Sequence, residues 1–257
     1  MLWALVKNTQ WEPLLSLLSP AFFDVVPGRM LFGELRGLTT RYLSQSSYRD
    51  ACEKRADSLE RARLPFEIVR ALPKPSEAFT EVARGDDLLT LYFHQVLGDG
   101  PVLLDMRRSA FVRADGRWLW KPEPAIAVWG EDFRAGCRAL YEGFYLDDAT
   151  RFSAGARALG LGEAEAQLRA QFGDTRAVSF SLNDFQKRFH EVFQRCKETR
   201  SKLHPGFLTL GLGLATLYEH LESVGVALDV RAAFDRVHSE REMRRSEGTR
   251  IPSAPGE

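Results

Sequence analysis

The chain has 257 residues, and its 35 lysines and arginines balance its 35 aspartates and glutamates, so the formal net charge is zero. A protein that binds nucleic acid nonspecifically needs an excess of basic residues, so this balance argues against that class. The hydrophobic share of 44% and the aromatic share of 11% are enough for a packed core and exclude a disordered chain.

The first 85 residues are predicted to form helices followed by a connector. The apolar stretch 2–23 opens the segment, and a helix with one interruption is expected from Met30 to about Arg63. Charges of alternating sign over its second half indicate a solvated face. Three prolines then predict a connector over 64–85.

Residues 86–129 are predicted to form a small three-stranded antiparallel meander. Three segments have the bulky and aromatic composition of strands: 88–97, 102–113 and 117–121. Turn sequences rich in glycine and aspartate separate them, at 98–100 and 114–116.

Residues 130–238 are predicted to form a helical bundle. Asp148 is a candidate helix cap, as is Ser181 or Asn183 further along the chain. The segment 207–224 is apolar almost all round, which is typical of a central core helix. The fold class is therefore α+β and mostly helical, in one compact domain, with the meander between the N-terminal helices and the bundle. Residues 239–257 are expected to be a disordered tail.

Cys52, Cys137 and Cys196 lie far apart and form no CxxC pair, so neither a disulfide framework nor a zinc ribbon is expected. The longest apolar run is shorter than the about 20 residues needed to cross a bilayer. The N-terminus also lacks the pattern of a secretory signal. A cytoplasmic protein without a transmembrane segment is the expectation.

One polar set in the predicted strands is a candidate catalytic site. Asp105 follows three apolar residues, and Arg107 would share its face by strand alternation. The sequence allows Asp105 to pair either with Arg107 or with His94. The alternative is a charged pair on a wet face of the sheet, which is the more common arrangement.

A cluster of aromatic residues is a candidate ligand pocket or protein interface: Phe111, Trp118, Trp120 and Trp129. The alternative favoured by their bulk is a small core where the sheet meets the helices.

His190, Glu219 and His220 are weak candidates for metal ligands, because helices packed face to face can hold a metal. The sequence has no Glu-x-x-His motif, so solvent-edge or hydrogen-bonded histidines are the favoured alternative. Gly211-Leu212-Gly213 lies within the apolar helix, where close packing explains it better than phosphate binding.

Three features lie between residues 103 and 228: an apolar run that ends at Asp105, helix-packing patterns over 140–161, and a closing helical pair over 185–222. Together they resemble the C-terminal lobe of the AarF/UbiB family of atypical kinases, over about half of the chain. The resemblance implies a kinase-like lobe in which Asp105 binds metal and Mg-ATP is the ligand.

The sequence departs from this family at the residues that carry its chemistry. Arg107 stands where the family's loop has glycine, and no catalytic aspartate or asparagine follows His94 at the family's spacing. No lysine–glutamate pair or Lys-x-Gly-Gln element is found, although phosphoryl transfer depends on such positioned charges.

The sequence therefore predicts a non-catalytic binding or scaffold protein, pseudokinase-like in part of its chain, that holds no cofactor. Its expected partner is another protein or a small apolar ligand. One alternative is a nucleotide-binding protein or enzyme that uses Asp105 with His94 and Arg107. Another is association with a membrane surface through residues 2–23.

Overall fold

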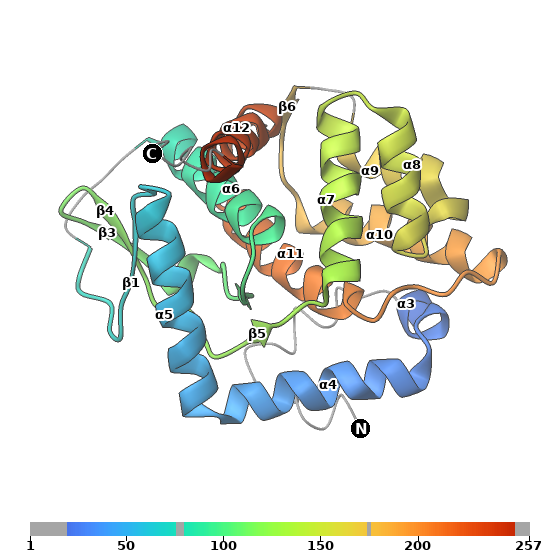
Figure 1. Ribbon diagram of the computed structural model, residues 1–257, viewed down its shortest axis with the longest axis horizontal. Helices are drawn as coiled ribbons and strands as arrows, with labels where there is room; N and C mark the ends of the chain where they lie inside the picture. The colour runs from blue at the N-terminus through green and yellow to red at the C-terminus, as the bar shows by residue number, and fades with distance from the viewer. Residues whose placement is uncertain (1–19, 76–79, 174–175, 250–257) are drawn as a thin grey trace, which may run out of the picture.

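The computed structural model describes residues 20–75, 80–173 and 176–249. Helices make up most of this part of the chain, and its strands are short (Figure 1). The α+β, mostly helical class is therefore confirmed. Most of the apolar N-terminal stretch 2–23 lies outside the described residues.

The N-terminal helices are α3 (Pro20–Val25), α4 (Gly28–Leu43) and α5 (Gln45–Arg61). Ser44 separates α4 from α5, and its side chain caps α5 by accepting a hydrogen bond from the Ser47 amide at 3.2 Å. The predicted interruption of the long helix is thus confirmed.

The predicted strand 88–97 is wrong, because these residues belong to helix α6 (Glu81–Leu97). The Thr80 side chain caps the helix by accepting from the Ala83 amide at 3.3 Å. Every residue from Leu88 to Leu97 is buried, so the segment is covered on all sides and has no solvent-facing stripe to identify it as a helix.

The three-stranded sheet consequently has a different composition from the predicted meander. Its order is β1 (Phe66–Ile68), β4 (Arg117–Trp120), β3 (Phe111–Ala114), and β1 runs parallel to β4. The β3–β4 turn forms as predicted, with positive φ angles of 52° at Asp115 and 73° at Gly116.

The predicted strand 102–113 is interrupted. Strand β2 (Val102–Leu103) pairs antiparallel with β5 (Ile126–Ala127) in a separate ladder. A loop and the 3-10 helix η1 (Arg108–Ala110) then lead into β3. The 3-10 helix begins directly after Arg107, so a continuous strand cannot run from Val102 to Arg113.

Helices α7 to α12 form the predicted C-terminal bundle. Their bounds are α7 Glu131–Tyr145, α8 Ala149–Ala158, α9 Glu165–Phe172, α10 Leu182–Glu198, α11 Phe207–Glu222 and α12 Val230–Thr249. The 3-10 helix η2 (Gly162–Ala164) precedes α9, and β6 (Ala177–Val178) pairs antiparallel with β7 (Leu228–Asp229).

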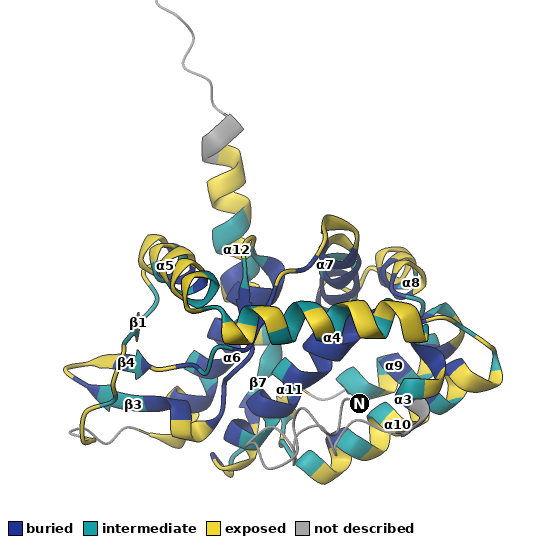
Figure 2. Cartoon of the chain, turned by 90° about the horizontal axis from the view of Figure 1, so that it is seen from below, coloured by how far each residue is buried: buried dark blue, intermediate teal, exposed yellow. Residues whose placement is uncertain are grey.

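Two predicted helix caps in the bundle are confirmed. Asp148 accepts from the Arg151 amide at 2.9 Å, and Ser181 accepts from the Asp184 amide at 3.3 Å. The predicted disordered tail is wrong for residues 239–249, because α12 continues through Thr249 and projects from the body of the molecule (Figure 2). Residues 250–257 lie outside the described part.

The core is centred on α6 and α11, whose residues are mostly buried (Figure 2). One cluster of buried apolar side chains extends along the chain from Phe22 to Val237. The predicted central position of the apolar helix is therefore correct. Within the described ranges, no helix is long and apolar enough to cross a membrane.

Candidate functional site

Asp105 and Arg107 form the ion pair that the sequence suggested, but in the core rather than on a wet face. The side chains join through Arg107 Nε to Asp105 Oδ1 at 2.7 Å and Arg107 Nη2 to Oδ2 at 2.9 Å. Asp105 is 1% exposed and Arg107 8%. The Glu123 amide donates to Oδ2 at 3.0 Å, so structural hydrogen bonds occupy both carboxylate oxygens.

His94 lies apart from this pair. It belongs to α6, where its Nδ1 atom is 3.4 Å from Arg55 Nη1 and its Nε2 atom is 3.5 Å from Ser58 Oγ. Burial, and then the positive charge of Arg55, lower the pKa of His94 to about 3. The three candidate catalytic residues are therefore not brought together by the contacts within the described part.

The aromatic candidates divide into two places. Phe111 stacks on Trp120 with ring centroids 5.4 Å apart, and Trp118 meets the edge of Phe111. Trp129 instead packs on Phe133 and donates from Nε1 to Thr209 Oγ1 at 2.8 Å. All four aromatic candidates are buried, so they are core residues, as the alternative interpretation expected.

The three weak candidates for metal ligands do not form a metal site. The buried His220 ring has a partner at each nitrogen. Its Nδ1 atom lies 3.0 Å from the backbone oxygen of Met106, and its Nε2 atom accepts a hydrogen bond from Arg84 Nε at 3.2 Å. Glu219 accepts from the Arg108 amide at 3.0 Å, and His190 is exposed on α10. A search of the described residues finds no cluster of three or more potential metal ligands.

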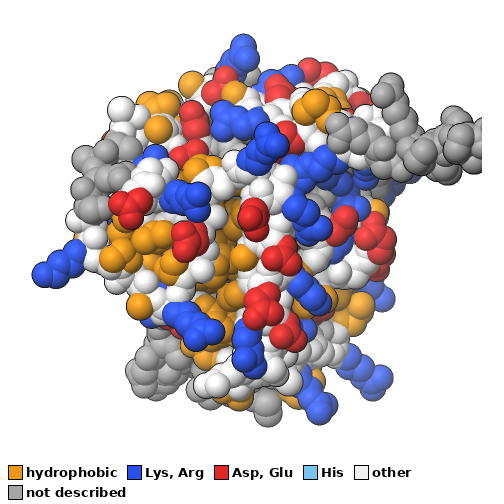
Figure 3. Space-filling view, turned by 60° about the vertical axis from the view of Figure 1, so that its left-hand side comes forward, with side chains coloured by type: hydrophobic (Ala, Val, Ile, Leu, Met, Phe, Trp, Pro, Cys, Tyr) orange, Lys and Arg blue, Asp and Glu red, His pale blue; other side chains and the backbone are white. Residues whose placement is uncertain are grey.

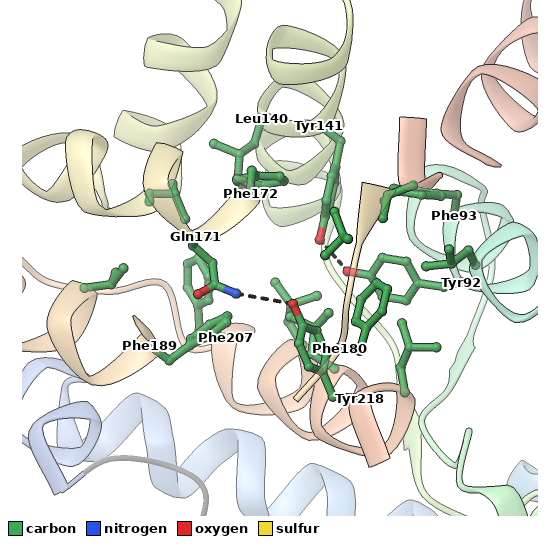
Figure 4. A pocket seen from close by; sticks show the side chains of 18 of the residues that line it. Tyr92, Phe93, Leu140, Tyr141, Gln171, Phe172, Phe180, Phe189, Phe207 and Tyr218 are labelled. Carbon is green, nitrogen blue, oxygen red and sulfur yellow. Dashed lines mark hydrogen bonds between the residues drawn. The ribbon is translucent and has the colours of Figure 1, made fainter. Parts of the chain in front are cut away.

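An apolar cavity of about 100 Å³ lies within the bundle (Figure 4). Its walls come from α6, α7, α9, α10 and α11, with contributions from the β6 region and the start of α12. The apolar walls include Leu89, Phe93, Leu140, Phe172, Phe207 and Leu217. A cavity of roughly 150 Å³ with such walls binds benzene. This one is smaller, so a short alkyl group fits as it stands and a small ring requires the lining side chains to move outward.

Five polar side chains line this apolar space: Tyr92, Tyr141, Tyr145, Gln171 and Tyr218. The hydroxyls of Tyr92 and Tyr141 point at each other and form a short hydrogen bond. Gln171 Nε2 donates to the Tyr218 hydroxyl at 3.4 Å (Figure 4). The other amide atom, Gln171 Oε1, is buried and has no hydrogen-bond partner in the described part.

The cavity carries no charge at ordinary pH. Burial raises the pKa of Tyr218 to about 12, and it raises the pKa values of Tyr92 and Tyr141 further above their usual value. Burial also raises the pKa of Tyr145, so all four phenols keep their protons. One hydrogen bond between Tyr92 and Tyr141 uses only one of their two hydroxyl protons, so the second proton is left for another acceptor.

An outer cleft lies next to the cavity. Tyr145, Phe172, Val178 and Val230 line both spaces. The outer cleft has a volume of about 1010 Å³ and also contains the side chains of Arg169, Arg176 and Arg231. A ligand that enters from the outside would have to pass the shared side chains.

Sequence reasoning did not identify this cavity, because its lining residues are distributed from α6 to α12. Each tyrosine lies on an otherwise apolar helix segment and resembles ordinary core packing. The available signal was Tyr92, Tyr141 and Tyr218 themselves, since a buried phenol must find a hydrogen-bond partner. Only the tertiary structure shows that the three hydroxyls face the same space.

No protein-family model matches this chain, and a search of the curated proteins finds no match.

Proposed function

We propose that this chain is a non-catalytic binding protein for a small, neutral, mainly apolar molecule that carries a hydroxyl group. The observation that carries the proposal is the buried Gln171 Oε1 atom, which has no partner and faces an apolar cavity. An unpartnered buried polar atom costs about 1–3 kcal/mol, and a ligand hydroxyl would remove this cost.

The chemistry of the lining supports a neutral ligand rather than an anion or a cation. The cavity walls are apolar, its phenols are uncharged, and no charged side chain is part of the lining. A charged ligand would lose its hydration without finding an opposite charge. Few polar groups in an apolar pocket are the usual means of orienting a neutral ligand.

Three probes of the same size test this proposal in the full-length protein. Benzyl alcohol has the oxygen, toluene lacks it, and benzoate carries a charge. We expect benzyl alcohol to raise the melting temperature most and benzoate to leave it unchanged at equal concentration. A ligand at a hundred times its dissociation constant stabilises a protein by about 2.7 kcal/mol, which is readily measured by calorimetry.

The variant Gln171→Leu removes both amide atoms from the cavity and should abolish the preference for benzyl alcohol over toluene. Gln167→Leu, on the same helix but outside the lining, is the matched control and should retain it. Absence of benzyl alcohol binding by the unmodified protein at millimolar concentration would disprove the proposal.

The kinase-like alternative, with Mg-ATP held at Asp105, stays a prediction. It would require the Asp105 carboxylate to leave Arg107 and the Glu123 amide. A thermal shift with Mg-ATP that disappears in Asp105→Ala would favour it over the apolar-ligand proposal.

A further inference from the structure

A second candidate site also involves α6, but its lining is charged where that of the apolar cavity is not. It is a cleft of about 550 Å³ between one face of α5 and one face of α12. Lys54, Ser58 and Arg61 follow each other at helical spacing on α5, and Arg241 and Arg244 do so on α12. Figure 1 shows these two helices on either side of α6.

The floor of the cleft combines His94 with the turn that ends α6, residues 98–100. Arg55 Nη1 is a permanent donor, so the facing His94 Nδ1 must accept. In the neutral ring the proton is then on Nε2, which lies 3.5 Å from Ser58 Oγ. The floor therefore offers an N–H donor rather than an acceptor.

The cleft has an excess of positive charge. Five basic and three acidic side chains line it. Two of the acids are engaged, Asp99 with Arg138 and Glu240 with Arg244. On the basic side, Arg241 pairs with Glu142 and Arg245 with Glu242. By contrast, Lys54 and Arg61 form no ion pair with a carboxylate in the part of the chain that the structure describes. Figure 3 shows one face of the molecule, on which Lys and Arg side chains alternate with Asp and Glu.

Behind the floor lies a buried positive charge without a negative partner. Arg55 is 1% exposed, donates to Pro101 O and contacts His94, while its Nε atom has no hydrogen-bond partner. No carboxylate of the described residues pairs with it. A buried charge without a counter-charge is strongly unfavourable, and an anion in the adjacent cleft would reduce that cost.

We infer that this cleft binds the phosphate group of a small organic phosphate monoester. Guanidinium groups match the geometry of phosphate oxygens and stay charged at all physiological pH values. The volume exceeds that of a phosphate ion and lies in the range of small-molecule sites, which leaves room for the organic part. The inference does not depend on the apolar cavity, whose walls contain no charged side chain.

The test is isothermal titration calorimetry of the full-length protein with inorganic phosphate and ribose 5-phosphate at constant ionic strength. Ribose and acetate serve as comparison ligands. We expect ribose 5-phosphate to bind at least as tightly as inorganic phosphate, and ribose and acetate to show no binding at the same concentrations.

The variant Arg61→Gln/Arg244→Gln removes one guanidinium from each wall and should weaken phosphate binding at least tenfold. Both side chains are exposed, so the protein should still fold. Arg36→Gln/Arg49→Gln is the matched control, because it removes the same charge at exposed positions of α4 and α5 outside the cleft. The control should change the dissociation constant by less than twofold.

Three results would overturn the inference. The first is no binding of either phosphate compound by the unmodified protein, and the second is equal weakening by the two double variants. The third is acetate binding as tightly as phosphate, which would show a general anion effect. Loss of benzyl alcohol binding in the cleft variant is not expected, so the two proposals fail independently.

Discussion

Asp105 is a carboxylate held in the protein interior by hydrogen bonds from four donors. They are Arg107 Nε and Nη2, the Arg107 amide and the Glu123 amide. The backbone oxygen of Asp105 also accepts from Trp120 Nε1 at 2.9 Å. Because the carboxylate and the guanidinium are both buried, each depends on the other for compensation of its charge.

Replacement of Asp105 by alanine should therefore lower the free energy of unfolding by about 3–5 kcal/mol, because it leaves the Arg107 charge buried without its partner. Urea denaturation followed by circular dichroism measures the change. Asp115→Asn in the exposed β3–β4 turn should change stability by less than about 0.5 kcal/mol. A loss below about 1 kcal/mol in Asp105→Ala would show that the pair is not structural.

The pairing of Asp105 with Arg107 could be predicted from the sequence, but its burial could not. Two residues of separation place the side chains on one face of an extended segment. Their burial depends on α11, whose Thr216 accepts from the Met106 amide at 3.2 Å from more than 100 positions away. The sequence around Asp105 carries no information about a helix that packs over it from more than 100 positions away.

At the scale of elements, the sequence predicted the helices whose two faces differ. Helix α10 has Phe185, Val192 and Cys196 buried on one side and charged residues on the other. Helix α6 was predicted as a strand because residues 88–97 are buried on all sides, so composition outweighed periodicity. The Thr80 cap was the local signal that a helix begins there.

Helices α7 and α8 pack closely through two glycines. A Cβ atom on Gly143 would lie 2.2 Å from the backbone nitrogen of Phe152, and one on Gly155 would lie 2.5 Å from that of Leu140. Backbone atoms cannot move aside as a flexible side chain can, so the two helices would have to separate.

We therefore expect Gly143→Ala to destabilise the protein by about 1–3 kcal/mol, the usual cost of overpacking. Gly33→Ala in α4 is the control with the opposite expected sign. No atom lies within 4 Å of a Cβ placed there, and alanine in a helix interior is favoured by roughly 0.5–1 kcal/mol. Thermal melting of both variants decides the matter, and equal effects would contradict this account of the helix contact.

At the scale of the whole molecule, the features that bear on function are assembled from distant segments. Strand β1 pairs with β4 across about 50 positions, and the apolar cavity combines residues from Leu89 to Val230. A pattern search along the chain finds periodicity within one element at a time. It could therefore predict most helices of the bundle but neither the sheet order nor the cavity.

Two buried histidines connect the stability of the whole fold to pH. Burial is the larger cause and the nearby guanidinium groups, Arg55 at His94 and Arg84 at His220, are the next; together they lower the pKa of both histidines to about 3. In the unfolded chain a histidine titrates near 6.5. Below that pH the unfolded state binds protons that the folded state does not, so the stability present above pH 6.5 is lost as the pH falls towards 3.

The free energy of unfolding should therefore fall by up to about 2.7 kcal/mol per pH unit below pH 6 from these two groups, at about 1.36 kcal/mol for each proton. Urea titrations between pH 5.0 and 7.5 measure this slope. His94→Gln and His220→Gln should each remove about half of it, whatever their effect on stability at pH 7.5. His190→Gln replaces an exposed histidine of α10 and should leave the slope unchanged. If the first two variants kept the full slope, the buried histidines would not be its source.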